Sequence, residues 1–175
     1  MKKFINITVA LILAGCFFGC EKDDICAGTT PTTSRLIVEF YDFNNPAILK
    51  SVTDLSAFGN GNTEGVVFNS AISDSTKYFI TGTSIALPLD ISTNITNYRL
   101  RIFSRSPEPA VYNDDEININ YTTEQLYVSR ACGYKTIFDL ENATRVGDAN
   151  EWIKNITFEP IIIDNEEDVH VKIYW

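Results

Sequence analysis

The stretch Ile117-Asn118-Ile119-Asn120-Tyr121 decides the expected fold, because apolar and polar side chains alternate along it one by one. This alternation places one set of side chains on the core face of a β-strand and the other set on its solvent face. Weaker versions of the same pattern occur on both sides of the stretch, at residues 36–41, 84–91, 98–102 and 169–175. The chain therefore reads as a succession of half-buried strands.

Turn signals separate these strands, and the strongest of them is Gly59-Asn60-Gly61-Asn62. No long stretch has the 3.6-residue period of a helix. We therefore expect an all-β fold, an antiparallel β-sandwich of immunoglobulin type with about eight to ten short strands. A small closed β-barrel is the alternative. Pro88 interrupts the 84–91 pattern and predicts that this strand lies at a sheet edge.

Residues 1–19 have the layout of an export signal. Two lysines follow Met1, and an almost uncharged apolar run then extends from Phe4 to Phe18. The run is too short for a membrane span, which needs about 20 apolar residues. It ends at a small residue before a cysteine, as in bacterial lipoproteins, where that cysteine carries the lipid. We expect a signal peptide at 1–19, a lipidated N-terminus and polar lead-in at 20–34, and a single β domain at 35–175.

Two cysteines compete for the lipid. Cys16 follows Leu13-Ala14-Gly15 and has the cleaner recognition pattern, whereas Cys20 follows two phenylalanines and Gly19. Cleavage at Cys20 removes both phenylalanines and leaves a polar start to the mature chain. It also leaves an even number of thiols, Cys26 and Cys132, which can pair. We therefore favour Cys20, with Cys16 as the alternative.

A disulfide between Cys26 and Cys132 is the default expectation for an exported chain. Cys26 is six residues beyond Cys20, and six extended residues reach only about 20 Å. The bridge would therefore fasten the domain almost directly to the membrane. We expect no metal site, because the chain has no Cys-x-x-Cys spacing and a single histidine.

The charge of the chain limits its partners. The formal net charge is −9, and removal of the signal peptide with Lys2 and Lys3 makes the mature chain still more acidic. Nucleic acids and anionic lipid headgroups both require a basic footprint. We expect the acyl anchor to be the contact with membrane lipid, and no nucleic-acid partner. Which protein or glycan the domain binds is not indicated.

The residues that could carry chemistry are few. His170 stands on the face opposite Val169 and Val171 and is expected to be a surface residue, not the base of a catalytic triad. The acidic clusters at 114–116 and 164–168 lie at expected turns, and neither has the spacing of a calcium-binding EF-hand loop. We therefore expect no cofactor and no enzymatic activity.

The most distinctive internal segment is Ser129-Arg130-Ala131-Cys132-Gly133-Tyr134-Lys135. Arg130, Tyr134 and Lys135 could form a recognition patch for an anionic or sugar ligand, through guanidinium donors and aromatic stacking. The alternative is structural: Cys132 fastens the strand, and Gly133 permits a close backbone approach or a bulge.

The segment Cys20-Glu21-Lys22-Asp23-Asp24-Ile25-Cys26 resembles the mature start of uncharacterised lipoproteins of Bacteroidetes, of flavobacterial type. The resemblance extends over most of the mature chain, through residues 30–31, 36–42, 129–135, 152–156 and 170–173. Within it, residues 22–24 resemble a surface-export signal, although a solvated spacer would look the same. The resemblance implies a lipoprotein domain of unknown function and transfers no catalytic residue.

Together these observations predict a lipid-anchored protein of the cell envelope, at the outer membrane and facing either the periplasm or the surface. A non-catalytic binding or structural module is the expected role. The alternative is an outer-surface lipoprotein that binds a carbohydrate or another small ligand. An enzyme of unrecognised type is the third possibility.

Overall fold

A computed structural model describes residues 25–26, 33–108, 111–147, 149–159 and 161–175. The expected signal peptide and both candidate lipid-bearing residues, Cys16 and Cys20, lie outside these ranges. The chain divides into two compact units, each considered by itself below. The disulfide unit comprises Met1–Thr30 and Leu126–Lys135, and the sheet unit comprises Pro31–Gln125 and Thr136–Trp175.

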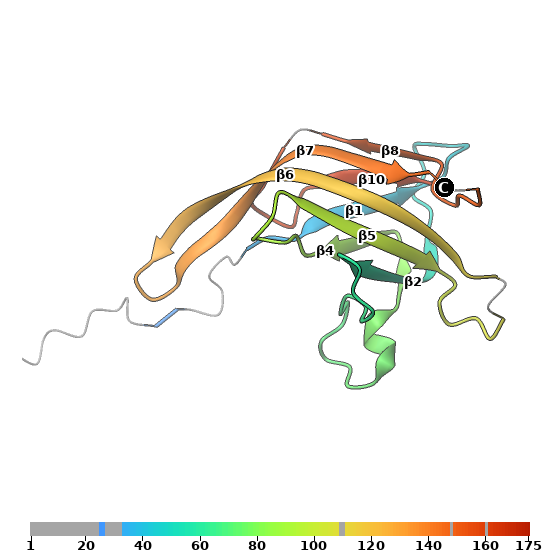
Figure 1. Ribbon diagram of the computed structural model, residues 1–175, viewed down its shortest axis with the longest axis horizontal. Helices are drawn as coiled ribbons and strands as arrows, with labels where there is room; N and C mark the ends of the chain where they lie inside the picture. Colours follow the sequence, from blue (N-terminus) through green and yellow to red (C-terminus); the bar gives the residue numbers. More distant parts are fainter. Residues whose placement is uncertain (1–24, 27–32, 109–110, 148, 160) are drawn as a thin grey trace, which may run out of the picture. The chain divides into compact units, whose positions relative to one another are not determined.

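Ten strands and one short 3-10 helix, η1 (Ser75–Tyr78), occur in the described part of the chain (Figure 1). Asp74 caps η1 by accepting the backbone N–H of Thr76 at 2.8 Å. The strands are β1 (Leu36–Tyr41), β2 (Val52–Gly59), β3 (Ile80–Gly82), β4 (Ser84–Leu87), β5 (Ile95–Ile102), β6 (Asn113–Ser129), β7 (Gly133–Val146), β8 (Asn155–Phe158), β9 (Ile162–Ile163) and β10 (Val171–Tyr174).

These strands form two sheets, which confirms the all-β prediction and is consistent with a sandwich. The order is β4-β1-β10-β8 in the four-stranded sheet and β3-β2-β5-β6-β7-β9 in the six-stranded sheet. Strand β10 runs parallel to β1, from the pair Val38 and Val171 to the pair Tyr41 and Tyr174. The sequence pattern had predicted antiparallel strands, and this parallel pair joins the two ends of the described sheet unit.

Two strands are much longer than expected. β6 has 17 residues and β7 has 14, whereas the alternation had predicted short strands broken after Tyr121. The discrepancy arises at residues 122–127, all of which are exposed. Where neither face of a strand is buried, alternation disappears while backbone pairing continues, so the pattern no longer reports the strand.

The turn at Gly59–Asn62 forms as predicted. Asn60 and Gly61 have φ angles of 47° and 75°, and the Asn62 N–H donates to the Gly59 carbonyl oxygen at 2.9 Å. Positive φ at both central positions is the geometry that favours an Asn-Gly pair. The edge prediction is also confirmed: β4 lies at the end of the four-stranded sheet, and Pro88 follows its last residue directly.

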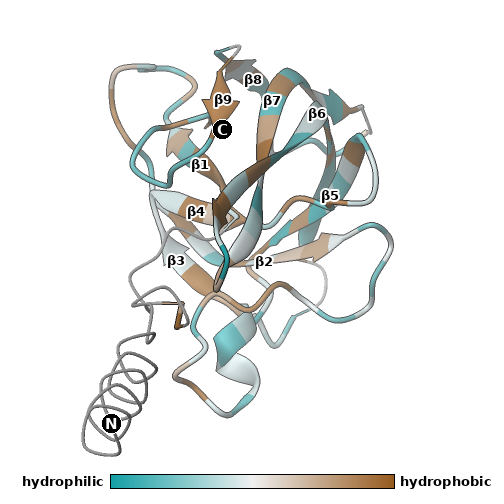
Figure 2. Cartoon of the chain, turned by 90° about the vertical axis from the view of Figure 1, so that its left-hand side faces the viewer, coloured by the Kyte–Doolittle hydropathy of each residue, from teal (hydrophilic) through white to brown (hydrophobic). Residues whose placement is uncertain are grey.

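The core contains the inward-facing side chains of both sheets, and their alternation with polar residues can be followed along the strands in Figure 2. Trp152, which precedes β8, connects the sheets. Its ring centroid lies 6.3 Å from that of Phe40 in the four-stranded sheet, and its Nε1 donates to the Leu100 carbonyl oxygen in the six-stranded sheet at 3.3 Å. Among the described residues, no helix is long and apolar enough to cross a membrane.

Candidate functional site

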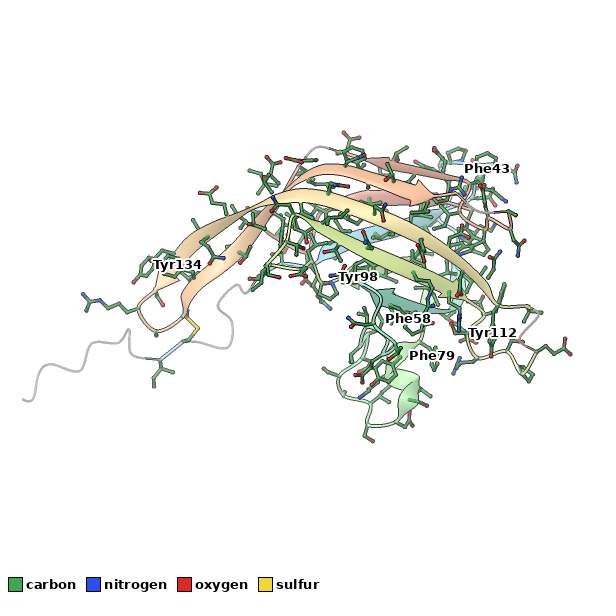
Figure 3. All side chains as sticks on the ribbon, viewed as in Figure 1. Phe43, Phe58, Phe79, Tyr98, Tyr112 and Tyr134 are labelled. Atoms are coloured by element: carbon green, nitrogen blue, oxygen red, sulfur yellow. A yellow bond between two sulfur atoms is a disulfide. The ribbon has the colours of Figure 1, made fainter. Side chains whose placement is uncertain are left out.

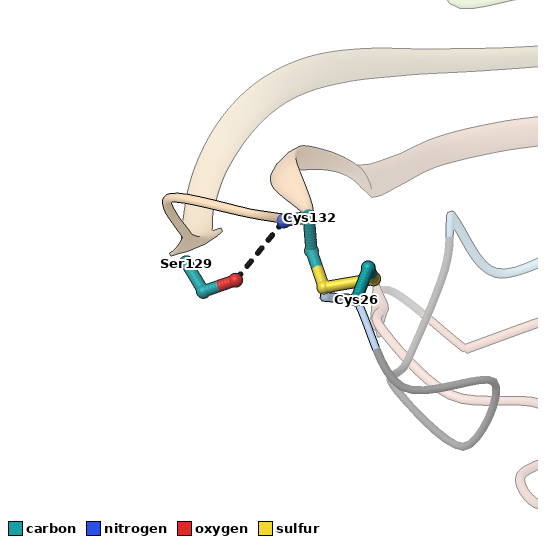
Figure 4. The surroundings of a disulfide bond; sticks show 3 residues. All are labelled: Cys26, Ser129 and Cys132. Carbon is teal, nitrogen blue, oxygen red and sulfur yellow. Dashed lines mark hydrogen bonds between the residues drawn. A yellow bond between two sulfur atoms is a disulfide. The ribbon is translucent and has the colours of Figure 1, made fainter. Parts of the chain in front are cut away.

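The disulfide unit contains the predicted cysteine pair. The sulfur atoms of Cys26 and Cys132 are bonded, and the Cα atoms lie 4.9 Å apart (Figure 4). The Cys132 N–H donates to Ser129 Oγ at 3.0 Å and closes the turn between β6 and β7. Gly133 has a φ of +69°, and among the described residues beyond its two chain neighbours no atom lies within 4 Å of the position that a Cβ would occupy. Backbone conformation therefore favours this glycine, and the close backbone approach that the sequence had suggested is not found among the described residues.

The three residues of the predicted recognition patch all lie in this unit. Arg130 and Tyr134 are exposed, and Lys135 is half-buried. Tyr134 is 65% exposed (Figure 3). Its ring packs edge-to-face against Tyr127 at a centroid separation of 5.4 Å. The most prominent feature of this surface is therefore a pair of tyrosine rings.

The acidic cluster at 114–116 is not a solvated turn, and that expectation was wrong. It forms the start of β6, and Asp115 is only 1% exposed. The Asp115 carboxylate accepts the backbone N–H of Trp152 at 3.1 Å and that of Ile153 at 2.7 Å. Asp115 thus fastens the segment that carries Trp152 to the six-stranded sheet.

The prediction that His170 is a surface residue was also wrong, because its exposed fraction in the structure is only 1%. The Ile37 N–H donates to its Nδ1 at 2.9 Å, while its own backbone N–H donates to the Ile37 carbonyl oxygen at 3.1 Å. His170 thereby extends the pairing of β1 and β10. Burial lowers its pKa, although Asp168 and Asp164 act in the opposite direction. A neutral imidazole with Nδ1 as acceptor is a structural element here.

Arginine and aromatic side chains alternate on the outer face of β5 and its neighbours. The guanidinium of Arg99 lies 4.7 Å from the ring centroid of Phe58, and that of Arg101 lies 5.3 Å from the ring centroid of Tyr112. Arg101 also makes a bidentate pair with Asp114, at 2.6 and 2.7 Å. Because Arg99 and Arg101 already contact aromatic rings and Asp114, this face is not a free basic patch.

Two adjoining hollows flank the Gly59–Asn62 turn, and we refer to them together as the turn groove. Their volumes are about 710 and 320 Å³, and they share Asn62, Thr63 and Tyr98. The lining is rich in amides, hydroxyls and carboxylates. The polar residues of the lining are Asn60, Asn62, Thr63, Glu64, Asp90, Thr96, Asn97, Arg99 and Glu116.

Buried hydroxyls hold the floor of the turn groove. The Tyr98 hydroxyl donates to the Pro88 carbonyl oxygen, and the Tyr121 hydroxyl donates to the Asp90 carbonyl oxygen at 2.7 Å. Tyr121 also shares a 2.6 Å hydrogen bond with Thr96. Burial raises the pKa of Tyr98 well above its usual range, so this phenol stays neutral. The network fixes segment 88–90, which forms one wall of the groove.

Within the described residues, the side chains of Asn62, Thr63 and Asn97 make no hydrogen bond in the folded chain. Their donors and acceptors therefore face solvent in the groove. Asp90 adds a carboxylate whose pKa is lowered, chiefly by the hydroxyl of Ser92 and then by its backbone N–H. The groove thus offers amide donors and acceptors beside a carboxylate whose charged form is favoured.

Comparison with known families gives one match. Residues 54–175 match a family of unknown function (DUF6452). The chain belongs to this family. No curated protein and no solved structure matches the chain. The match confirms that part of the resemblance which indicated a domain of unknown function; the lipoprotein and Bacteroidetes parts stay predictions.

The DUF6452 match includes the turn groove, Asp115, Cys132 and His170, but begins after Cys26. Sequence reasoning missed the groove because its lining comes from separate stretches of the chain, at 58–67, 88–99 and 116. The only local signal was the Asn60-Gly61 turn, which predicts a hairpin and not a groove. In the part of the chain that the structure describes, no group of three His, Cys, Asp or Glu side chains could hold a metal ion.

Proposed function

We propose that this DUF6452 protein is a lipid-anchored protein of the cell envelope, at the outer membrane, which acts by binding and not by catalysis. In this proposal Cys20 carries the lipid. The observation that supports it is the disulfide between Cys26 and Cys132. A cysteine six residues after the proposed lipid site is bonded to the turn between β6 and β7.

This connection suits an anchored protein. A disulfide persists in an exported protein and is rare in the reducing cytosol. Only five residues separate Cys20 from Cys26, so the Cys26–Cys132 bridge stays within about 20 Å of an acylated Cys20. A disulfide placed so close to the N-terminus suits a protein that is held at the membrane by Cys20, whereas a freely diffusing protein has no need of this short spacing.

Intact mass spectrometry of the protein from its native membrane tests the proposal. A triacylated N-terminal Cys20, with a mass gain of two hydrogen atoms on reduction, would support it. Cys20→Ala should abolish the lipid and release the protein from the membrane, whereas Cys16→Ala should leave both unchanged. An unacylated mature chain, or loss of the lipid in the Cys16→Ala variant only, would refute the assignment of Cys20.

The turn groove favours a second candidate function, the binding of a carbohydrate at the outer surface. The amides of Asn62 and Asn97 and the hydroxyl of Thr63 match the neighbouring hydroxyl groups of a sugar, which also donate and accept. The ring of Phe58 is already covered by Arg99, so hydrogen bonds and not ring stacking would hold such a ligand.

A glycan array that carries neutral and acidic oligosaccharides tests this candidate. We expect retention of neutral oligosaccharides, because Asp90 and Glu64 add negative charge to the groove. The double variant Asn62→Ala/Thr63→Ala should lose that retention. Glu167→Ala, an exposed residue that does not line the groove, is the matched control and should retain it. Retention that survives the double variant would exclude the groove.

A further inference from the structure

The disulfide unit exposes an unusual number of large apolar and aromatic side chains for its size. In its described residues, 25–26 and 126–135, Ile25 is 84% exposed, Tyr127 is 55% exposed and Leu126 is 44% exposed. Tyr134 adds a fourth, and its ring packs against that of Tyr127. We refer to these four side chains as the tyrosine tip. Leu126 and Tyr127 are consecutive in β6 and so lie on opposite faces of the strand, which makes the tip a hairpin end that is apolar on both faces. Large exposed apolar groups concentrated at one end of a unit mark a surface that contacts something other than water.

The chemistry of the tyrosine tip matches a membrane–water interface. Tyrosine has an apolar ring and a polar hydroxyl, and it is enriched where one end of a side chain meets lipid and the other meets water. Leu126 and Ile25 are purely apolar and can enter the edge of the hydrocarbon. The four side chains of the tyrosine tip are uncharged. Their contact with lipid would therefore not need the basic residues that attract a protein to anionic headgroups, which this acidic chain lacks.

The position of the tip in the chain indicates which surface it meets. Ile25 directly precedes the disulfide, and the chain outside the structure on this side runs back through four residues to Cys20. The headgroup layer on each side of a bilayer is about 5–8 Å thick, and the tether reaches at most about 20 Å. A surface fastened by a disulfide at the end of that tether cannot leave the neighbourhood of the bilayer.

We infer that the tyrosine tip docks into the headgroup region of the membrane that holds the anchor. The acyl chains would supply the affinity, and the docked rings would fix the orientation of the disulfide unit. The inference rests on the proposed function in one respect, because it assumes a short lipid tether at residue 20. The occupant is a lipid bilayer and not a protein partner.

The test supplies the tether artificially, so that it does not depend on natural acylation. The chain from Glu21, which keeps every described residue, carries an N-terminal polyhistidine tag and is bound to phosphatidylcholine vesicles containing a nickel-chelating lipid. Tyr134→Trp provides the probe, and the parent protein supplies the background from Trp152 and Trp175. The quencher is phosphatidylcholine with acyl chains brominated near the glycerol backbone.

On brominated vesicles we expect the added tryptophan to lose the larger part of its emission, and on plain vesicles its maximum should shift to the blue. The matched variant adds Leu126→Ser and Tyr127→Ser to the probe and should remove both effects while binding the vesicles equally well. An added tryptophan that is neither shifted nor quenched would overturn the inference and favour a protein partner for the tip. Natural acylation is measured separately by mass, so its failure would refute the anchor and leave this result standing.

Discussion

Replacement of Asp115 by alanine should be among the most damaging single substitutions in the sheet unit. The carboxylate is 1% exposed and accepts two backbone N–H groups, those of Trp152 and Ile153, which are themselves buried. Alanine removes both acceptors and offers nothing in their place. Water cannot reach the two donors unless the segment that contains Trp152 moves away from the six-stranded sheet.

The magnitude follows from the number of donors left without a partner. Each buried N–H that loses its acceptor costs about 1–3 kcal/mol, so the two together cost about 2–6 kcal/mol. A domain of this size has a total stability of about 5–15 kcal/mol, so the loss is a large fraction of it. Both N–H groups make their shortest bonds to the same oxygen, Oδ2, so Asp115→Asn, which keeps one carbonyl oxygen for that position, should cost less than alanine. Glu116→Ala, the exposed neighbour, should stay within about 0.5 kcal/mol of the parent.

Urea unfolding followed by tryptophan fluorescence measures these differences, since the two indoles, Trp152 beside the broken contacts and Trp175 packed against it at 6.0 Å, both report on this part of the core. With a urea dependence of about 2 kcal/mol per molar, the Asp115→Ala midpoint should fall by roughly 1–3 M. The alanine variant should also shift the native emission to the red, because Trp152 gains water. Asp115→Ala and Glu116→Ala curves that coincide would refute the role assigned to the carboxylate.

Three further outcomes are expected. Because burial holds the pKa of His170 below its ordinary 6.5, the unfolded chain binds the proton first, so the free energy of unfolding should decrease as the pH falls below about 6.5. His170→Gln should flatten that part of the pH profile, and an unchanged slope would contradict the assignment. Reduction of the Cys26–Cys132 bridge, which closes a loop of 106 residues, should lower the free energy of unfolding by at most about 4–5 kcal/mol in urea titrations; a value near zero would mean that the bridge does not constrain the unfolded chain. Gly61→Ala should cost about 1–2 kcal/mol because of its φ of +75°. At Gly82, which has no positive φ, a Cβ would meet the Ser84 carbonyl oxygen at an ordinary contact distance of 4.0 Å, so Gly82→Ala should be neutral or gain up to about 1 kcal/mol; equal effects in thermal melts would refute the distinction.

The alternation of side chains was enough to predict most strands and their inward faces. It even contained the information on Asp115, which shares its phase with Ile117 and Ile119 and so faces the core. The acidic cluster that contains it was nevertheless expected at a turn. The acidic composition of the cluster was misleading here, whereas the periodicity was correct. A buried carboxylate is stable only where hydrogen-bond donors face it, and for Asp115 the donors are the backbone N–H groups of residues 152–153.

His170 shows the opposite failure. Periodicity placed it on the outer face of the last strand, but β10 begins only at Val171, and residues 170 and 171 are both buried. The chain has not yet entered the strand at His170, so the two-residue period does not apply there. No local pattern could reveal that Ile37, far away in the sequence, would present its N–H to the imidazole.

The sequence by itself determined the strand phases, the Asn60-Gly61 turn, the edge position of β4 and the choice of Cys26 and Cys132 as partners. These depend on local backbone preference, on the side-chain period and on the even number of thiols. Only the tertiary structure decided the parallel pairing of β1 with β10, the turn groove, and the burial of two polar side chains. Those features depend on which distant segments meet, and contacts between distant segments are set by the packing of the whole core.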